Sequence, residues 1–77
     1  MTISRMAEEI VQAGATILVD SWSVSVSIEL ERMYDGVVYG EPLVYRKHNG
    51  NIMQAIEDVV IEAHPRLEEI RNIVDGN

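Results

Sequence analysis

Residues 22–31 alternate strictly between apolar and polar side chains, and this period-two pattern constrains the fold more than any other feature of the sequence. The apolar members are Trp22, Val24, Val26, Ile28 and Leu30, and serines and glutamates stand between them. Successive side chains of a β-strand point to opposite faces of a sheet, so the pattern predicts a strand with one buried and one polar face. Such a strand needs neighbouring strands and a second layer over its apolar face.

A second, shorter strand is predicted over residues 16–19. Its apolar residues have odd numbers, whereas those of the longer strand have even numbers, so the chain must reverse this parity between the two. A tight turn at Asp20 and Ser21, which pairs Val19 with Trp22, would reverse it, and so would a bulge within one long bent strand. We favour the turn, because a single continuous strand would be unusually long.

The dipeptide Asp35-Gly36 lies between two β-rich runs and predicts a type I′ hairpin, because both central positions of that turn need positive φ. The register that continues from this turn makes three cross-strand pairs: Tyr34 with Val37, Ile28 with Leu43, and Val26 with Tyr45. Gly40 and Pro42 interrupt the third strand. Because proline cannot donate to a ladder, we expect this strand at the edge of the sheet, with a bulge near Glu41.

Two helical regions flank the predicted sheet. Residues 3–13 place their apolar side chains on one helical face, with Thr2 as the N-cap and Gly14 after the last turn. Residues 52–74 carry a second apolar stripe through Pro65, where the helix must kink or restart because proline removes a hydrogen bond. The expected fold is α+β: an N-terminal helix, a three-stranded antiparallel sheet, and a C-terminal helix kinked or broken at Pro65. Both helical regions should cover one face of the sheet.

The chain has 77 residues, enough for one core only, so residues 1–77 are expected to form a single domain. The expected core unites the apolar faces of the helices and strands: Ile3, Met6, Ile10, Ile17, Val19, Trp22, Val24, Val26, Ile28, Leu30, Leu43, Ile52, Ile56, Val59, Val60, Leu67 and Ile70.

The formal net charge is −7, with 13 acidic against 6 basic side chains. A nucleic-acid binder neutralises phosphates with lysine and arginine, so direct binding of DNA or RNA is disfavoured. The absence of cysteine excludes disulfides and thiolate metal sites and fits a reducing cytoplasm. The sequence has no apolar run of transmembrane length and no secretory leader, so we expect a cytoplasmic protein without a membrane partner.

No arrangement of nucleophilic or metal-binding residues predicts catalysis. The serines at positions 21, 23, 25 and 27 alternate along the polar, solvent-facing side of a strand, whereas a catalytic serine sits on a sharp turn that exposes its oxygen. His48 and His64 are out of helical phase with Asp58 and Glu62, so no metal-ligand set forms. We therefore expect a non-enzymatic protein without catalytic residues, metal or cofactor, whose outer surface carries its function.

Acidic residues of the sheet have spacings typical of a negatively charged binding surface. Glu29 and Glu31 project from the polar face about 6.6 Å apart, because each strand residue rises about 3.3 Å. Asp35 and Glu41 lie at the hairpin tip and on its edge strand. Separations of about 6 to 7 Å resemble those of every second phosphate of a DNA strand. These acids could mimic nucleic acid toward a basic protein, although excess charge also serves solubility.

The second helix and the hairpin add further candidate binding residues. Asp58 and Glu62 share one helical face as a like-charge pair, which is unfavourable unless a neighbour such as Arg66 compensates it. Tyr34 and Tyr39 lie on the hairpin, and tyrosine is a frequent anchor of protein interfaces. We predict that these residues contact a protein partner.

The chain runs from a short amphipathic helix, MTISRMAEEI, through a small sheet around TILVD, SVSVSIELE and a YDG hairpin, to a long acidic helix, NIMQAIEDVVIEA. This order of elements resembles that of small phage-encoded inhibitors such as the anti-CRISPR proteins. The resemblance spans most of the chain as an outline and carries over no binding residue. It implies an inhibitor that occupies the basic surface of a nucleic-acid-handling complex, such as a nuclease or a CRISPR effector. The alternative hypothesis is a small structural or assembly module that acts through homodimerisation.

Overall fold

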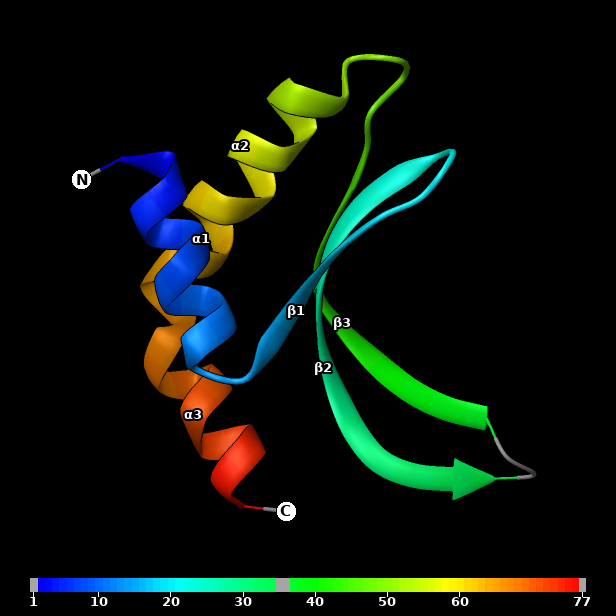
Figure 1. Ribbon diagram of the computed structural model, residues 1–77, viewed down its shortest axis with the longest axis vertical. Helices are drawn as coiled ribbons and strands as arrows, with labels where there is room; N and C mark the ends of the chain where they lie inside the picture. The colour runs from blue at the N-terminus through cyan, green and yellow to red at the C-terminus, as the bar shows by residue number, and fades with distance from the viewer. Residues whose placement is uncertain (1, 35–36, 77) are drawn as a thin grey trace.

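The computed structural model describes the backbone of residues 2–34 and 37–76, and the side chains of residues 2–28 and 42–76. Its elements follow the expected order (Figure 1): α1 (Ile3–Gln12), β1 (Ala15–Val19), β2 (Ser23–Tyr34), β3 (Val37–Lys47), α2 (Ile52–Ala63), the 3₁₀ turn η1 (His64–Arg66) and α3 (Leu67–Asp75). The α+β class predicted from the sequence is confirmed.

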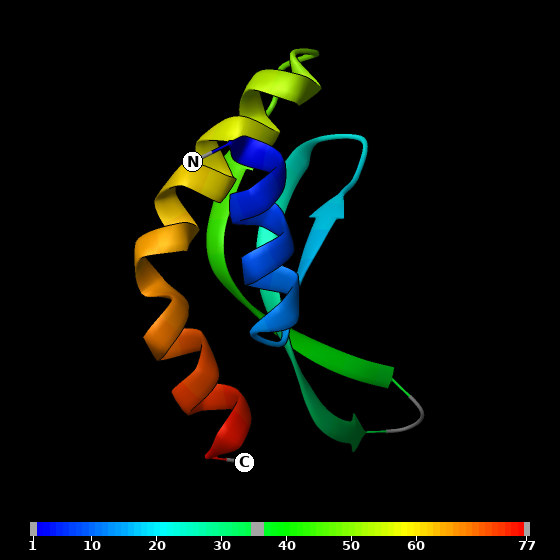
Figure 2. The ribbon, with the colours of Figure 1, turned by 60° about the vertical axis from the view of Figure 1, so that its left-hand side comes forward.

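The strands form one antiparallel sheet in the order β1-β2-β3, so the alternating strand β2 is central, as predicted. The described helices all lie on the same side of this sheet, with α1 over β1 and with α2 along β2 and β3 (Figure 1 and Figure 2). The far half of the β2–β3 pair curves away from the helical layer.

The core lies between the helices and the inner face of the sheet. Val24 and Val26 of β2 are fully buried there, in one cluster with Ile10 of α1, Val59 of α2 and Ile70 of α3. Other predicted members are partly buried against this cluster: Ile3, Met6, Ile17, Leu43, Ile56 and Leu67. One face of β2 is therefore buried and covered by helices, as the alternation predicts.

Three residues predicted in the core are exposed instead. Val19 at the end of β1 is 50% exposed, Trp22 is 78% exposed and Ile52 at the start of α2 is 40% exposed. Trp22 lies in the turn between β1 and β2, where the apolar alternation continues past the part of the sheet that is buried. The side chain of Leu30 lies outside the described residues.

The predicted pairing of Val19 with Trp22 is wrong, because Val19 lies opposite Val24. Asp20 and Ser23 close the turn instead. The Asp20 N–H donates to the carbonyl oxygen of Ser23 at 2.9 Å, while the Ser23 N–H donates to the Asp20 carboxylate at 2.7 Å. A side-chain acceptor thus replaces a backbone acceptor and leaves Trp22 in the loop. The preference for a turn over one long bent strand is confirmed.

The β2–β3 register is also partly different from the prediction. Three observed pairs define it: Tyr34 with Val37, Val26 with Val44, and Ile28 with Glu41. The first was predicted and the other two were not. The ladder passes from Val44 to Pro42 and skips Leu43, so a bulge lies at Leu43 instead of near Glu41. A second irregularity lies between Glu29 and Met33 of β2.

The helix termini follow from local hydrogen bonding. The Thr2 hydroxyl accepts from the Arg5 N–H at 3.2 Å and caps α1, and the Asn51 side chain accepts from the Gln54 N–H at 3.4 Å and caps α2. Pro65 lies in η1, which separates α2 from α3. The predicted break of the C-terminal helix at Pro65 is confirmed.

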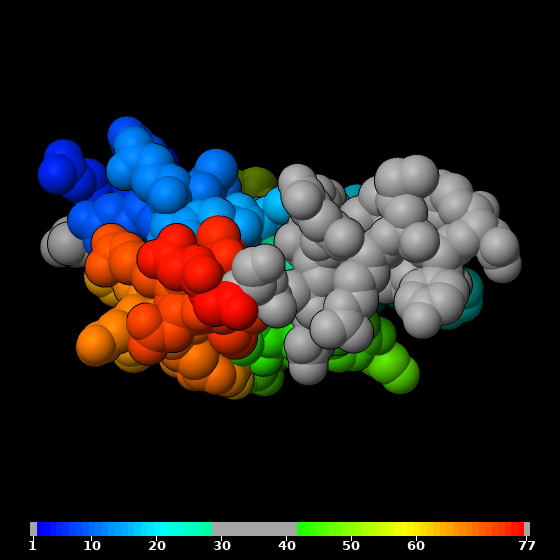
Figure 3. Space-filling model, turned by 90° about the horizontal axis from the view of Figure 1, so that it is seen from below, coloured from blue at the N-terminus to red at the C-terminus, as the bar shows by residue number. Residues whose placement is uncertain are grey.

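Gly14 joins α1 to β1 with a φ of +111°, which L side chains rarely adopt. A Cβ at this position would lie 2.8 Å from Cγ2 of Val74, because the end of α3 packs against this turn (Figure 3). Gly14→Ala should therefore lower the free energy of unfolding by more than the roughly 1 to 3 kcal/mol that backbone strain costs alone. Gly50 has a φ of +87° with nothing within 4 Å of a Cβ, so Gly50→Ala should cost only the strain. Equal losses in urea unfolding would contradict a role for the Val74 contact.

Ile28 is 2% exposed on the inner face of the central strand. Ile28→Ala should lower the free energy of unfolding by about 2 to 5 kcal/mol, because it removes buried methylenes and leaves a cavity. Leu18 lies on the opposite face of the sheet and is 48% exposed, so Leu18→Ala should cost much less. Thermal melts followed by circular dichroism compare the two variants, and an unchanged melting temperature for Ile28→Ala would disprove its central position.

Candidate partner-binding surface

Most residues predicted to bind a partner belong to the β2–β3 hairpin. Asp35 and the side chains of Glu29, Glu31, Tyr34, Tyr39 and Glu41 lie outside the described residues, so their contact with a partner stays a prediction. The backbone places Glu29 opposite Gly40 and Glu41 opposite Ile28. These positions belong to the strand pair that curves away from the helices (Figure 1).

Asp58 and Glu62 are the two predicted residues whose side chains are described. Asp58 accepts a hydrogen bond from the side-chain amide of Gln54 at 3.1 Å. Glu62 forms an ion pair of 3.3 Å with Arg46 of β3, and both side chains are about half exposed. The cation that forms an ion pair with Glu62 is therefore Arg46. Arg66, suggested by the sequence, also interacts with this acid: hydrogen bonds to Glu69, and the charges of Glu69 and Glu62, raise the pKa of Arg66.

Every charged residue of α2 is acidic: Glu57 and Asp58 lie at its middle, and Glu62 lies in its last turn. Negative charge is unfavourable near the C-terminus of a helix, because the last carbonyl groups already carry a partial negative charge. Ile61 lies among these acids and is 52% exposed, on the side of α2 away from the buried Ala55, Val59 and Ala63. Of the three acids, Glu62 thus lies where the electrostatics of the helix oppose it.

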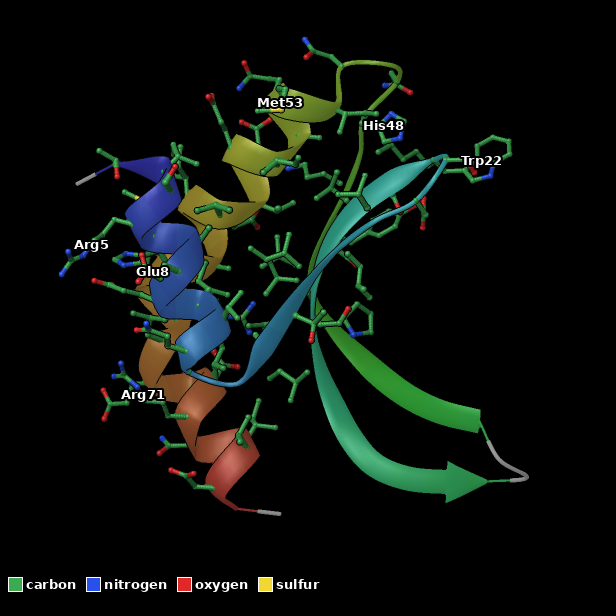
Figure 4. The ribbon with its side chains drawn as sticks, viewed as in Figure 1. Arg5, Glu8, Trp22, His48, Met53 and Arg71 are labelled. Carbon is green, nitrogen blue, oxygen red and sulfur yellow. The ribbon has the colours of Figure 1, made fainter. Side chains whose placement is uncertain are left out.

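The acidic surface continues along α3, which follows α2 on the same side of the molecule (Figure 2). Glu68 and Asp75 are exposed on the helix opposite the buried Ile70. Together Glu57, Asp58, Glu62, Glu68 and Asp75 form what we call the acidic helix face. The basic Arg71 also points outward from α3 (Figure 4). The sequence prediction missed Glu57, Glu68 and Asp75. Extending the helical periodicity of α2 beyond Pro65 could have identified Glu68 and Asp75.

Arg66 ties α3 to β3. Its guanidinium donates two hydrogen bonds of 2.8 Å to the Glu69 carboxylate and one of 3.1 Å to the carbonyl oxygen of Leu43. The hydrogen bonds from Arg66 lower the pKa of Glu69. A hollow of about 200 Å³ lies beside this pair, lined also by Ile28 and Ile73. Because these donors are already bonded within the protein, we assign Arg66 a structural role.

His64 has a structural role at the other side of the helical layer. Its Nε2 lies 2.6 Å from the carboxylate of Glu9, which also approaches Arg5 at 3.8 Å. This contact joins α1 to η1 across the surface of the protein. It accounts for a histidine that would otherwise be a candidate metal ligand or catalytic base.

The serines of β2 were expected on a solvent-facing side, and this is wrong for two of them. Ser23 and Ser27 are buried, because the strands and the turn pack around them. The Ser23 hydroxyl contacts both carboxylate oxygens of Asp20 at 3.1 Å, and Ser25 and Ser27 approach each other at 3.4 Å. These hydroxyl groups take part in local bonding.

His48 connects the turn between β1 and β2 to the loop before α2. Its Nε2 lies 3.0 Å from the carbonyl oxygen of Asp20, and its Nδ1 accepts from the Gly50 N–H at 3.0 Å. The backbone N–H of His48 donates to the carbonyl oxygen of Trp22 at 3.1 Å. Trp22, whose N–H donates to the Asp20 carboxylate at 2.8 Å, is therefore held by hydrogen bonds on both sides.

Within residues 2–28 and 42–76, no group of three or more acidic or histidine side chains could hold a metal ion. None of the described helices is long and apolar enough to cross a membrane. Comparison with known proteins finds no matching family model, curated protein or solved structure. The candidate surface is therefore described by the residues and contacts of this chain alone.

The turn at Asp20 predicts a dependence of stability on pH. Hydrogen bonds from the N–H groups of Trp22 and Ser23 hold the pKa of Asp20 below its ordinary value. The ionised carboxylate thus stabilises the fold above about pH 4, and this contribution is lost as the pH falls through the lowered pKa of the folded protein. In urea unfolding, Asp20→Asn should be destabilised relative to the parent at about pH 7, and the difference should shrink toward about pH 2. A pH-independent deficit for Asp20→Asn would contradict the assignment.

Proposed function

We propose that the protein is a non-enzymatic binding protein that inhibits a nucleic-acid-handling complex by occupying its basic surface, as the small phage-encoded inhibitors it resembles in outline do. The observation that carries this proposal is the charge of α2. Its charged residues Glu57, Asp58 and Glu62 are all acidic, and Glu62 lies in the last turn, where negative charge is unfavourable. Solubility alone requires neither a helix whose charges are all acidic nor an acid in its last turn, whereas a surface for a cationic partner would favour both.

The geometry of α2 supports this reading. Asp58 and Glu62 are separated by about 6 Å along the helix axis, because each residue rises about 1.5 Å. This resembles the spacing of every second phosphate in a DNA strand. The buried side chains of α2 hold the helix against β2 and β3, so its acids are presented from a packed element. A preorganised negative surface attracts a basic channel before contact and speeds association.

The partner we propose is a protein with a basic nucleic-acid channel, such as a nuclease or a CRISPR effector complex. Direct binding of nucleic acid is disfavoured by the net charge of −7. Glu29, Glu31, Asp35 and Glu41 of the hairpin are proposed as a second acidic segment, with Tyr34 and Tyr39 as apolar anchors beside it. The acidic helix face and the hairpin would then contact the partner as two separate segments.

Asp58→Lys tests the proposal against a closely matched control. Asp58 accepts a hydrogen bond from Gln54, and Glu8 of α1 accepts one from Gln12, each across one helical turn. Both exchanges therefore change the same charge and remove a similar local bond. Asp58→Lys should weaken binding to purified CRISPR effector complexes or DNA nucleases about tenfold or more at about 0.1 M salt, since close charge pairs at interfaces contribute over 1.4 kcal/mol. Glu8→Lys should change it less than about twofold.

Binding is measured by surface plasmon resonance over a salt series, with inhibition of cleavage of a fluorescent duplex as the functional readout. The same assay on Glu29→Lys and Glu31→Lys tests whether the sheet acids belong to the same surface. Equal losses for Asp58→Lys and Glu8→Lys would show that only bulk charge matters. Binding that none of the three reversals weakens would overturn the proposal.

A further inference from the structure

Large apolar side chains gather at one end of the molecule, where the β1–β2 turn and the start of α2 meet. They are Val19, Trp22, Ile52 and Met53, all exposed by between 40% and 78%, and we call this group the apolar end. Leu18 and Tyr45 are also exposed, but both lie across from Ser25 on the outer face of the sheet. Trp22 and Met53 lie on either side of His48 at this end, and the indole of Trp22 points away from the sheet (Figure 4). Exposed apolar groups scattered singly need no explanation, but a group centred on an exposed tryptophan marks an interaction site.

Trp22 is presented by a turn that is already ordered. Its N–H donates to the Asp20 carboxylate and its carbonyl oxygen accepts from the His48 N–H, so both backbone groups are bonded. Binding through Trp22 would therefore order little more than the indole itself. Tryptophan side chains held in this way are frequent anchors of protein interfaces, because they bury a large area at a small cost in entropy.

The apolar end has a charge unlike that of the acidic helix face. The first turn of α2 contains no acidic residue, and the nearest acid along that helix is Glu57. Asp20 lies close by, but its carboxylate is occupied by N–H groups and by the Ser23 hydroxyl. On β3, Lys47 lies opposite Ser23, next to Trp22, and the preceding Arg46 is paired with Glu62. Two copies of a chain with a net charge of −7 repel one another over acidic surfaces, and at this end they do so least.

We propose that the apolar end is a homodimer interface, in which Trp22 of each copy packs against Ile52 and Met53 of the other. An isologous dimer uses the same patch twice, so the patch must contain both a protruding group and the apolar surface that receives it. Trp22 protrudes, and the side chains at the start of α2 supply that surface. The charge distribution favours a second copy, because this end combines apolar area with little free negative charge. The dimer leaves the acidic helix face uncovered.

Trp22 is the only tryptophan of the chain, so it reports directly on this interface. The parent protein should change from monomer to dimer in a dilution series followed by light scattering and analytical ultracentrifugation. The tryptophan emission should move to shorter wavelength over the same concentration range, because the indole leaves water. A monomer at all concentrations up to about 1 mM overturns the proposal. A dimer whose formation leaves the emission unchanged also overturns it, because the interface then lies elsewhere.

Substitutions separate this surface from the others. Trp22→Ala should weaken the dimer about a hundredfold by ultracentrifugation, because twofold symmetry removes an anchor worth at least about tenfold from both sides. Met53→Ser should weaken it and shift the emission change to higher concentration. Ile61→Ser is the matched control, since Ile61 is 52% exposed on the acidic helix face, and it should leave dimerisation unchanged. An equal effect of Ile61→Ser and Met53→Ser would overturn the assignment. Asp58→Lys, which tests the proposed function, should not alter the dimer, so the two proposals fail independently.

Discussion

The burial of one face of β2 under the helical layer is the contact on which the rest of the structure depends. Val24 and Val26 are fully buried between the helices and the sheet, and each helix contributes a buried residue to the same cluster. In a chain of 77 residues this cluster is the main source of hydrophobic stabilisation. Covering the inner face of a three-stranded sheet uses the apolar stripes of α1, α2 and α3 together, so the charged residues are left on the outer sides of the helices.

This arrangement places the candidate functions on the surface. The acids of α2 and α3 lie opposite the buried stripes of their own helices, and the tie between Arg66 and Glu69 fixes α3 against β3. The histidines and the serines of β2 take part in contacts that hold elements together, which leaves them structural roles. A surface whose charge is set by helix packing is also rigid, and rigidity lowers the entropy lost when a partner binds.

The sequence predicted the elements better than it predicted their connections. Alternation in β2, the cap at Thr2 and the break at Pro65 are local properties, and local physics decides them. The position of Trp22 was wrong because the alternating pattern continues into a turn that the Asp20 side chain holds open. Side-chain acceptors of this kind change the register without any change in hydrophobic pattern.

The candidate site shows the same division. Asp58 and Glu62 were recognisable from their helical spacing. Arg46, the ion-pair partner of Glu62, comes from strand β3, and only the folded chain shows that pairing. The bulge at Leu43 likewise moved the β2–β3 register, because the ladder skips the residue that follows Pro42.

The separation of the apolar end from the acidic helix face follows from the geometry of α2. This helix begins with the exposed apolar residues Ile52 and Met53, and its acids Glu57, Asp58 and Glu62 follow from its middle to its last turn, so its first turn differs in charge from the rest. Because α2 packs against β2 and β3, the apolar end and the acidic helix face are held in fixed positions on the molecule. A dimer through the apolar end would therefore keep the acidic helix face of each copy exposed. A single small domain could then use one surface for self-association and the other for a basic partner. A dimer that binds through the acidic helix faces of both copies would raise the effective concentration of acid at a basic channel, although each copy makes the same contacts as a monomer.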